Sequence, residues 1–357
     1  MADQNLTSSQ PLPPTPNQQS LPVAQTRTDA VRLRQHAAIH RAPRTVWEMF
    51  LRLTRANAAI ALTMPSLCGA ILAWWQLGIF HSLSFIFHLG SVLTMALGIN
   101  ALNEYCDYQH AQKAVSTGDM TVQSAPRAET MMTGYSLMNN GVTTPTVALT
   151  IGYWMITASL LCSLWLTLLV GWPMLFFSGL SFILAYAYAH PPIQYGYRGW
   201  GLGELGVWIG YGLLPIVGSY YSQGQILSWL PIWVSLPLGL FSMLIFFNYN
   251  LVHEYRDWLM HKRTLVVSIG TERALDLSAL VVLAVYIALL GIVSLSHLPL
   301  SALVTLAALP IALGAFSRVR RAQVTLEDRV LLYSTTVNAM IWTGLLFSFA
   351  LISDRLL

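Results

Sequence analysis

Apolar runs of about 20 residues recur along this chain from residue 57 to residue 353. A helix of that length can cross the hydrocarbon core of a bilayer, which is roughly 30 Å thick. The composition agrees, because 55% of the residues are hydrophobic and 10% are charged, against roughly 25% charged in a soluble domain. We therefore expect an all-α membrane protein with about nine transmembrane helices, at residues 57–78, 84–106, 145–166, 170–189, 203–222, 229–252, 274–295, 298–316 and 332–353.

The basic residues predict how these helices are oriented. With the N-terminus in the cytoplasm, almost every Lys and Arg falls on the cytoplasmic side, and the opposite connections, around His81, Gly171, Gln223 and His297, hold none. This distribution is typical of membrane proteins, whose cytoplasmic loops are rich in Lys and Arg. It accounts for the net charge of +4, and no basic patch with interleaved aromatic residues indicates a nucleic-acid partner.

The N-terminal residues 1–43 differ in composition from the rest of the chain. They are rich in Gln, Pro, Ser and Thr and contain a run of arginines, which predicts a disordered basic tail. Residues 44–357 would then form one transmembrane domain. A long connection at residues 108–143 is expected to form a cytoplasmic cap. No feature of the sequence indicates an obligate protein partner.

Two polar stripes interrupt the apolar runs near their cytoplasmic ends. Each stripe holds four polar residues at relative positions 0, 3, 4 and 7, which lie on one face of a helix. Burying such groups against lipid costs roughly several kcal/mol each, so the stripes must face the protein interior or a water-filled cavity. They stand on the second and sixth expected helices, which suggests two four-helix halves plus one helix. The stripes are Asn100, Asn103, Glu104 and Asp107, and Asn250, His253, Glu254 and Asp257.

Two acidic faces that converge on one cavity are suited to a bound Mg²⁺, which prefers oxygen ligands and is often shared with phosphates. This pattern indicates a diphosphate whose departure is assisted by the metal. If the diphosphate departs from an allylic carbon, it leaves a cation behind, and aromatic side chains near the stripes would stabilise that cation. The candidate catalytic residues are Asp107, Asp257 and Glu254, and the candidate metal ligands are Asp107, Glu104, Glu254 and Asp257.

Amide and basic side chains around the stripes are expected to bind the diphosphate itself. Lys and Arg would take the phosphate charge that the metal leaves. For any one basic residue, plain charge on a cytoplasmic loop is an equally good interpretation. The candidates are Asn103, Asn250, Lys113, Arg127, Arg198, Lys262 and Arg263.

Four separated motifs resemble one family. Asn103-Glu104-Tyr105-Cys106-Asp107-Tyr108 resembles the first acidic motif of the UbiA-type intramembrane aromatic prenyltransferases, and His253 to Asp257 with Lys262-Arg263-Thr264-Leu265 resembles the second. Tyr-x-x-Pro-Pro at 188–192, with Tyr-Arg-Gly at 197–199 and Gly-Glu at 203–204, resembles the form in the menaquinone branch, the 1,4-dihydroxy-2-naphthoate prenyltransferases. Arg52-Leu-Thr-Arg55 with Pro65 also matches. The resemblance runs from about residue 47 to the C-terminus. It implies nine helices, a Mg²⁺ cofactor, and transfer of a polyprenyl group from its diphosphate to an aromatic carbon in a bacterial-type plasma membrane.

The chain departs from that family at positions where further acids are usual. After the first motif those places hold Ala111 and Lys113. In the second motif, either His253 replaces the first aspartate or the link from Asp257 to Lys262 is one turn short. These departures leave three hypotheses: a naphthoate prenyltransferase that binds one metal ion or two, a prenyltransferase for another acceptor such as a hydroxybenzoate, homogentisate, chlorophyllide or a secondary metabolite, and a transporter or binding protein without activity.

Overall fold

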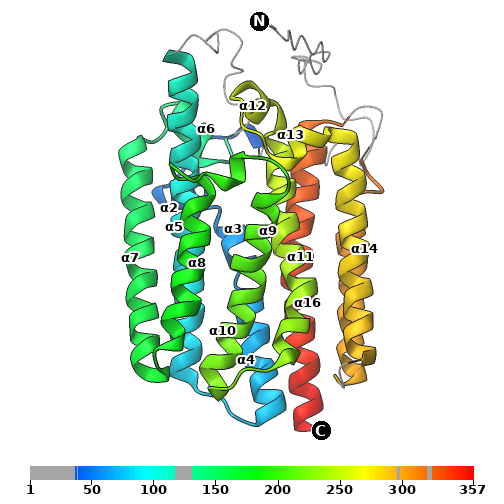
Figure 1. Cartoon of the computed structure of the whole chain (residues 1–357). Helices are drawn as coiled ribbons and strands as arrows, with labels where there is room; N and C mark the ends of the chain where they lie inside the picture. The colour runs from blue at the N-terminus through cyan, green and yellow to red at the C-terminus, as the bar shows by residue number, and fades with distance from the viewer. Residues whose placement is uncertain (1–36, 38, 117–130, 296–297, 320–323) are drawn as a thin grey trace, which may run out of the picture.

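The polypeptide folds into long helices whose axes run side by side, with several short helices gathered at one end (Figure 1). The computed structural model describes residues 37, 39–116, 131–295, 298–319 and 324–357. Within these residues the chain forms helices and connecting turns, and no β-strand is present. The expectation of an all-α fold is therefore confirmed.

Seven helical stretches in the described part of the chain are long and apolar enough to cross a membrane. Two shorter apolar helices, α8 (Pro173–Ala189) and η3 with α15 (Leu300–Ala308 and Leu309–Leu313), lie where two further spans were expected. The count of nine spans therefore stays a prediction. The seven stretches are α3 and α4 (Ala56–Ala61 and Met64–Leu77), α5 (Ser82–Ser116), α7 (Pro145–Val170), α9 to α10 (Leu202–Trp208, Ile209–Leu213 as η2, and Leu214–Gly224), α11 (Trp229–Val252), α14 (Thr271–Leu295) and α16 (Leu326–Leu356).

Local sequence signals fix where several of these helices begin. The Thr144 side chain accepts a hydrogen bond from the backbone N–H of Val147, and Pro145 occupies the first turn of α7. Thr325 and Asp328 form a reciprocal capping box at the start of α16. Such caps satisfy backbone N–H groups that have no partner within the helix, so they favour these starting points.

Close helix crossings depend on residues without side chains. A Cβ atom placed on Gly98 of α5 would lie 2.9 Å from the Gly152 carbonyl oxygen of α7. A Cβ atom on Gly69 of α4 would lie 2.4 Å from the Ile216 carbonyl oxygen of α10. Small residues that let backbones approach closely are typical of helix contacts in membranes. These two crossings bring the first helices of the chain against α7 and α10.

The helix that carries the first polar stripe is longer than expected. It was expected to end near residue 106, but α5 continues to Ser116 and projects beyond the bundle (Figure 1). The extension contains no Gly or Pro and is rich in Ala, Gln and other residues that favour helix. Part of the expected cap is therefore helical, with α6 (Gly134–Asn139) following later. Residues 117–130, including Arg127, lie outside the described residues.

The second polar stripe does not lie on one continuous helix. Helix α11 ends at Val252, and α12 (Glu254–Leu259) begins after His253, whose backbone angles are φ −108° and ψ 14°. A short helix α13 (Leu265–Ile269) follows before α14. The expectation that the four residues share one helical face is wrong for this reason, because the break at His253 changes the direction of the chain within the stripe.

Candidate functional site

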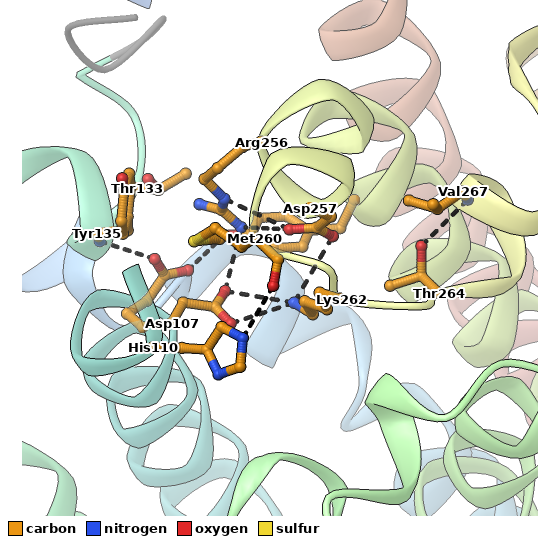
Figure 2. A network of polar contacts seen from close by, with 12 residues as sticks. Asp107, His110, Thr133, Tyr135, Arg256, Asp257, Met260, Lys262, Thr264 and Val267 are labelled. Atoms are coloured by element: carbon orange, nitrogen blue, oxygen red, sulfur yellow. Dashed lines mark hydrogen bonds and ion pairs between the residues drawn. The ribbon is translucent and has the colours of Figure 1, made fainter. Parts of the chain in front are cut away.

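The two acidic motifs meet at the end of the bundle where the short helices α2 (Val46–Leu53), α6, α12 and α13 lie (Figure 1). Asp107 projects from α5, and Asp257 projects from α12 toward the same place (Figure 2). The prediction that one acid from each stripe reaches a common site thus agrees with the arrangement of these two residues. We call them the acid pair.

Two cations bridge the acid pair. The Arg256 Nη2 atom lies 3.1 Å from Asp107 Oδ2 and 3.2 Å from Asp257 Oδ1. The Lys262 Nζ atom lies 3.1 Å from Asp107 Oδ1 and 3.6 Å from Asp257 Oδ2. All four side chains are at least nine-tenths buried. Buried charges persist only when they are paired, so these four groups form one charge-balanced unit.

Backbone contacts hold Lys262 in that position. The Lys262 N–H donates to the Asp257 carbonyl oxygen at 2.8 Å, and the Arg263 N–H donates to the Tyr197 carbonyl oxygen at 3.2 Å. A ring nitrogen of His110, on the extended end of α5, lies 2.9 Å from the Met260 carbonyl oxygen. The segment between α12 and α13 is therefore tied both to α5 and to η1 (Tyr195–Tyr197).

Aromatic rings cover the two cations. The Arg256 guanidinium lies 4.6 Å from the centre of the Tyr135 ring, and the Lys262 ammonium lies 4.4 Å from the centre of the Tyr197 ring. The Tyr197 hydroxyl donates to Asp107 Oδ1 at 2.7 Å. Burial and the neighbouring Asp107 carboxylate raise the pKa of Tyr197 well above its usual value. Tyr197 is therefore a neutral hydrogen-bond donor to the first acid.

Polar atoms without hydrogen-bond partners remain at this site. Arg256 Nη1 and Asp257 Oδ2 are both buried and make no hydrogen bond. Burial raises the pKa of Asp257, although Lys262 and Arg256 act in the opposite direction. An unsatisfied buried group costs roughly 1–3 kcal/mol, so its presence needs an explanation. A ligand that accepts from Arg256 Nη1 and contacts Asp257 Oδ2, whose nearest cation is Lys262 Nζ at 3.6 Å, would supply it.

Glu104 is already fully engaged. Its Oε2 atom accepts a hydrogen bond from the Tyr135 N–H at 2.8 Å, and its Oε1 atom accepts one from the Tyr249 hydroxyl. Arg55 Nε lies 3.3 Å from the same Oε1 atom. Glu104 therefore links α5 to α6, α11 and the start of α3. This arrangement favours an anchor over an open metal ligand.

Glu254 lies in a separate ion pair. Arg329 Nη1 is 3.2 Å from Glu254 Oε2, and the Thr271 hydroxyl donates to the same oxygen. The break at His253 turns Glu254 toward α14 and α16, whereas Asp257 turns toward α5. The described contacts thus place Glu254 apart from the acid pair, and its predicted catalytic and metal-binding roles are not supported by them.

The remaining predicted residues are divided between the interior and the surface. Asn103 and Asn250 are buried, and Asn103 Oδ1 has no hydrogen-bond partner. Lys113, Arg198 and Arg263 are exposed, and Arg198 donates to the Pro192 carbonyl oxygen at 3.2 Å. Of the basic candidates that the structure describes, Lys262 contacts the acid pair.

Two arginines of the site were not predicted as functional. Arg256 lies inside the second motif, and its position directly before Asp257 is a signal that could have suggested it. Arg55 has a φ of 48°, a left-handed backbone that is uncommon for residues other than Gly. Its guanidinium lies 4.2 Å from the centre of the Tyr249 ring. The sequence shows that both residues are basic, but only the fold shows what they contact.

Whether a divalent metal ion fits this site depends on which side-chain oxygens are available to bind it. No group of three or more His, Cys, Asp or Glu side chains that could hold a metal ion is present among the described residues. The acid pair offers hard carboxylate oxygens, one of them free of hydrogen bonds, whereas Glu104 and Glu254 are occupied elsewhere. The acid pair therefore offers oxygens of the kind that Mg²⁺ prefers, and within the described residues the Arg256 and Lys262 side chains already contact them.

Comparison with known proteins settles the family. Residues 62–342 match the model of the UbiA prenyltransferase family. The chain belongs to the UbiA prenyltransferase family. Membership makes this protein a multi-pass membrane prenyltransferase, and the predictions of family and reaction class are confirmed.

Two curated relatives of this UbiA-family protein are named for naphthoate chemistry. It is 32% identical over 139 residues to a 2-carboxy-1,4-naphthoquinone phytyltransferase of Synechocystis, a match that spans 39% of this chain and 45% of that relative. It is 25% identical over 271 residues to a 1,4-dihydroxy-2-naphthoate octaprenyltransferase of Mycobacterium leprae, a match that spans 75% of this chain and 82% of that protein.

Solved structures agree with the fold. A UbiA homolog from Archaeoglobus fulgidus, bound to GPP and Mg²⁺, superposes with a TM-score of 0.56 at 14% identity, covering 85% of this chain and 99% of that chain. A UbiA homolog from Aeropyrum pernix gives a TM-score of 0.56 at 15% identity, covering 82% of this chain and 97% of that chain. At this identity the likeness concerns the architecture of the UbiA-family protein.

Proposed function

We propose that this UbiA-family protein transfers a polyprenyl group from an allylic polyprenyl diphosphate to 1,4-dihydroxy-2-naphthoate, in a Mg²⁺-dependent reaction of menaquinone biosynthesis. The observation that carries the proposal is the acid pair, in which one carboxylate from each motif faces the same two cations. The names of the Synechocystis and Mycobacterium relatives support the choice of acceptor. The Mg²⁺ and GPP bound to the Archaeoglobus homolog support the cofactor and the donor.

The acid pair would hold the metal ion. When bound, a divalent cation neutralises negative charge that develops on the departing diphosphate. Tyr197 and the two bridging cations fix the positions of the Asp107 and Asp257 carboxylates for this role. Because Glu104 and Glu254 use their oxygens in other contacts, the arrangement favours one ion over two.

Arg256 and Lys262 would bind the diphosphate oxygens. Arg256 keeps one buried Nη group free, and a guanidinium can bind the acid pair and a phosphate at the same time through different N–H groups. Lys262 carries three donors on a flexible stem. Of the other predicted diphosphate ligands, Arg198 and Arg263 lie exposed nearby and could contribute only at the mouth of the site.

The surroundings suit an allylic cation. Tyr249 and Phe246 lie on α11 just before the second motif, and the Tyr249 ring packs edge-on against His253 at 4.7 Å between centres. Aromatic faces stabilise a cation that has lost its diphosphate. The apolar interior of the bundle excludes water, which would otherwise quench that cation. The distribution of basic residues supports a site that opens to the cytoplasm. The bacterial sources of the two naphthoate relatives support a bacterial-type plasma membrane.

A reconstitution assay tests the proposal. Purified protein in lipid nanodiscs, mixed with farnesyl or longer diphosphate, 1,4-dihydroxy-2-naphthoate and Mg²⁺, should form prenylated product, and Asp107→Asn should abolish it. A panel with hydroxybenzoate and homogentisate decides between acceptors. Absence of product with every acceptor would favour the hypothesis of a binding protein or transporter, and full activity of Asp107→Asn would remove the assigned role of the acid pair.

A further inference from the structure

The connection between α8 and α9 carries an exposed basic surface outside the acid pair. This connection, residues 190–201, lies at the same end of the bundle as α12 and α13 (Figure 1). Its Arg198 is exposed, and so is Arg263 of the segment between α12 and α13. The connection and α9 together hold a single acid, Glu204, which is buried. We call Arg198 and Arg263 the arginine pair.

Backbone contacts bring the arginine pair together. Arg198 and Arg263 form a parallel bridge, in which the Arg263 N–H donates to the Tyr197 carbonyl oxygen at 3.2 Å. A Cβ atom added to Gly199 would lie 3.5 Å from the Arg263 carbonyl oxygen, so the two segments are in direct contact. Among the ion pairs of the described residues, none includes either arginine. Like charges held close together repel one another, so the pair favours an anion as a ligand.

An exposed tryptophan lies beside the arginine pair. Trp200 is 92% exposed and has a φ of 60°, a backbone angle that is rare for a bulky residue. The flanking Gly199 and Gly201 have φ angles of 75° and 72°, so three consecutive left-handed residues form the turn that presents the indole ring. Strained backbone persists mainly at functional positions. The turn therefore indicates that Trp200 contacts something outside this chain.

The outer face of α9 continues this surface as an apolar one. Leu202 and Leu205 are exposed and lie three positions apart, on one face of the helix. Because α9 begins a stretch that is long enough to cross a membrane, we expect these two side chains to lie against lipid acyl chains. Tryptophan is enriched where a membrane protein meets the membrane surface, and Trp200 lies directly before this face. The arginine pair is therefore expected at the level of the lipid headgroups.

Each arginine directly follows a residue that contacts Asp107. The Tyr197 hydroxyl donates to Asp107 Oδ1 at 2.7 Å, and Lys262 Nζ lies 3.1 Å from the same oxygen. The side chains of Tyr197 and Lys262 thus face the first acid, whereas those of Arg198 and Arg263 are exposed. A ligand that holds the arginine pair together would also hold together the two segments that bring Tyr197 and Lys262 to the acid pair.

We propose that the arginine pair binds the phosphate group of an anionic phospholipid, with Trp200 among the headgroups and the acyl chains along Leu202 and Leu205. Two guanidinium groups offer N–H donors that suit phosphate oxygens. The bound headgroup neutralises the repulsion between the two arginines and stabilises the segments that position Tyr197 and Lys262. The protein is therefore expected to be more stable in membranes that contain anionic lipid. The inference concerns the surrounding lipid, so it does not depend on which acceptor the enzyme uses.

A lipid phosphate fits this surface better than the diphosphate of the prenyl donor. The cations at the acid pair, Arg256 and Lys262, are at least nine-tenths buried, as a site that keeps water from an allylic cation requires. The arginine pair is exposed and lies beside an exposed indole ring. A headgroup that stays in contact with water meets these conditions.

A binding test does not require turnover. Native mass spectrometry of the purified protein, with phosphatidylglycerol and phosphatidylcholine in equal amounts, measures the preference for the anionic lipid. This preference should fall roughly fivefold in Arg198→Gln and in Arg263→Gln, because each arginine near the headgroups contributes about that factor. The matched control is Arg273→Gln, an exposed arginine at the start of α14, which should keep the wild-type preference. An unchanged preference in both arginine-pair variants, or an equal loss in the control, would overturn the inference.

Thermal unfolding in nanodiscs separates the lipid from the substrate. Replacing phosphatidylcholine by phosphatidylglycerol should raise the unfolding temperature of the wild type more than that of the Arg198→Gln/Arg263→Gln double variant. Inorganic pyrophosphate, added to phosphatidylcholine nanodiscs, is the probe for the diphosphate site. If the double variant loses stabilisation by pyrophosphate but keeps stabilisation by phosphatidylglycerol, the arginines belong to the diphosphate site and the inference is overturned. If the wild type forms no product with any acceptor while the arginine-pair variants lose the lipid preference, the proposed function fails and the lipid site stands.

Discussion

Replacing Arg256 by Met tests the shared-cation arrangement. The substitution removes the guanidinium that lies 3.1 Å from Asp107 and 3.2 Å from Asp257, and leaves two buried acids with Lys262 alone. Removing one partner of a buried ion pair costs roughly 3–5 kcal/mol, and little of this is screened because the Asp257 side chain is fully buried. Thermal unfolding in nanodiscs should therefore occur at a clearly lower temperature than in the wild type.

Added Mg²⁺ should partly reverse the loss in Arg256→Met. With Arg256 absent, the acid pair carries excess negative charge, so the divalent cation should stabilise the variant more than the wild type. KM for farnesyl diphosphate should rise roughly 10- to 100-fold, because a charge-assisted hydrogen bond contributes about 1.5–3 kcal/mol. The control is Arg273→Met, an exposed arginine at the start of α14, which should change neither quantity. Unaltered diphosphate KM together with wild-type Mg²⁺ stabilisation in Arg256→Met would refute the reasoning.

Three further substitutions test which contacts act in catalysis and which stabilise the fold. Tyr197→Phe removes the hydroxyl that donates at 2.7 Å to the first acid, so kcat should fall about threefold to tenfold in the prenyl-transfer assay with folding intact. Arg329→Met removes the ion pair with Glu254. Thermal stability should drop, while the Mg²⁺ concentration for half-maximal activity should stay constant. A change in that Mg²⁺ concentration would indicate that Glu254 is a metal ligand. Gly98→Leu would force α5 and α7 apart, and size-exclusion chromatography should show loss of folded protein, whereas wild-type yield would contradict the crossing.

Much of the architecture was predictable because it follows from local physics. The length of an apolar run predicts a membrane helix regardless of which other helices pack against it, so the all-α fold and the approximate spans could be derived from the sequence. Asp107 and Asp257 could be found because burying an acid in an apolar helix requires a reason. The duplication into two four-helix halves stays a prediction, as does the disordered tail at residues 1–43, most of which lies outside the described residues.

What the sequence could not show depends on long-range contacts. Periodicity places His253, Glu254 and Asp257 on one face only if the helix continues, and the break after Val252 sends Glu254 to Arg329 instead. Four acids that look equivalent in sequence thus have different partners. The contribution of Arg256 depends on a carboxylate 149 positions away in the chain, which no local pattern contains.

The central claim is that one carboxylate from each motif acts on a single Mg²⁺–diphosphate unit. Equilibrium binding of farnesyl diphosphate, with and without Mg²⁺, tests it in the wild type, Asp107→Asn, Asp257→Asn and the double variant. The account predicts that Mg²⁺ strengthens binding in the wild type, that either single substitution removes this effect, and that the double variant loses little more, because coupled residues are not additive. Mg²⁺-strengthened binding in either single variant, or fully additive losses, would contradict it.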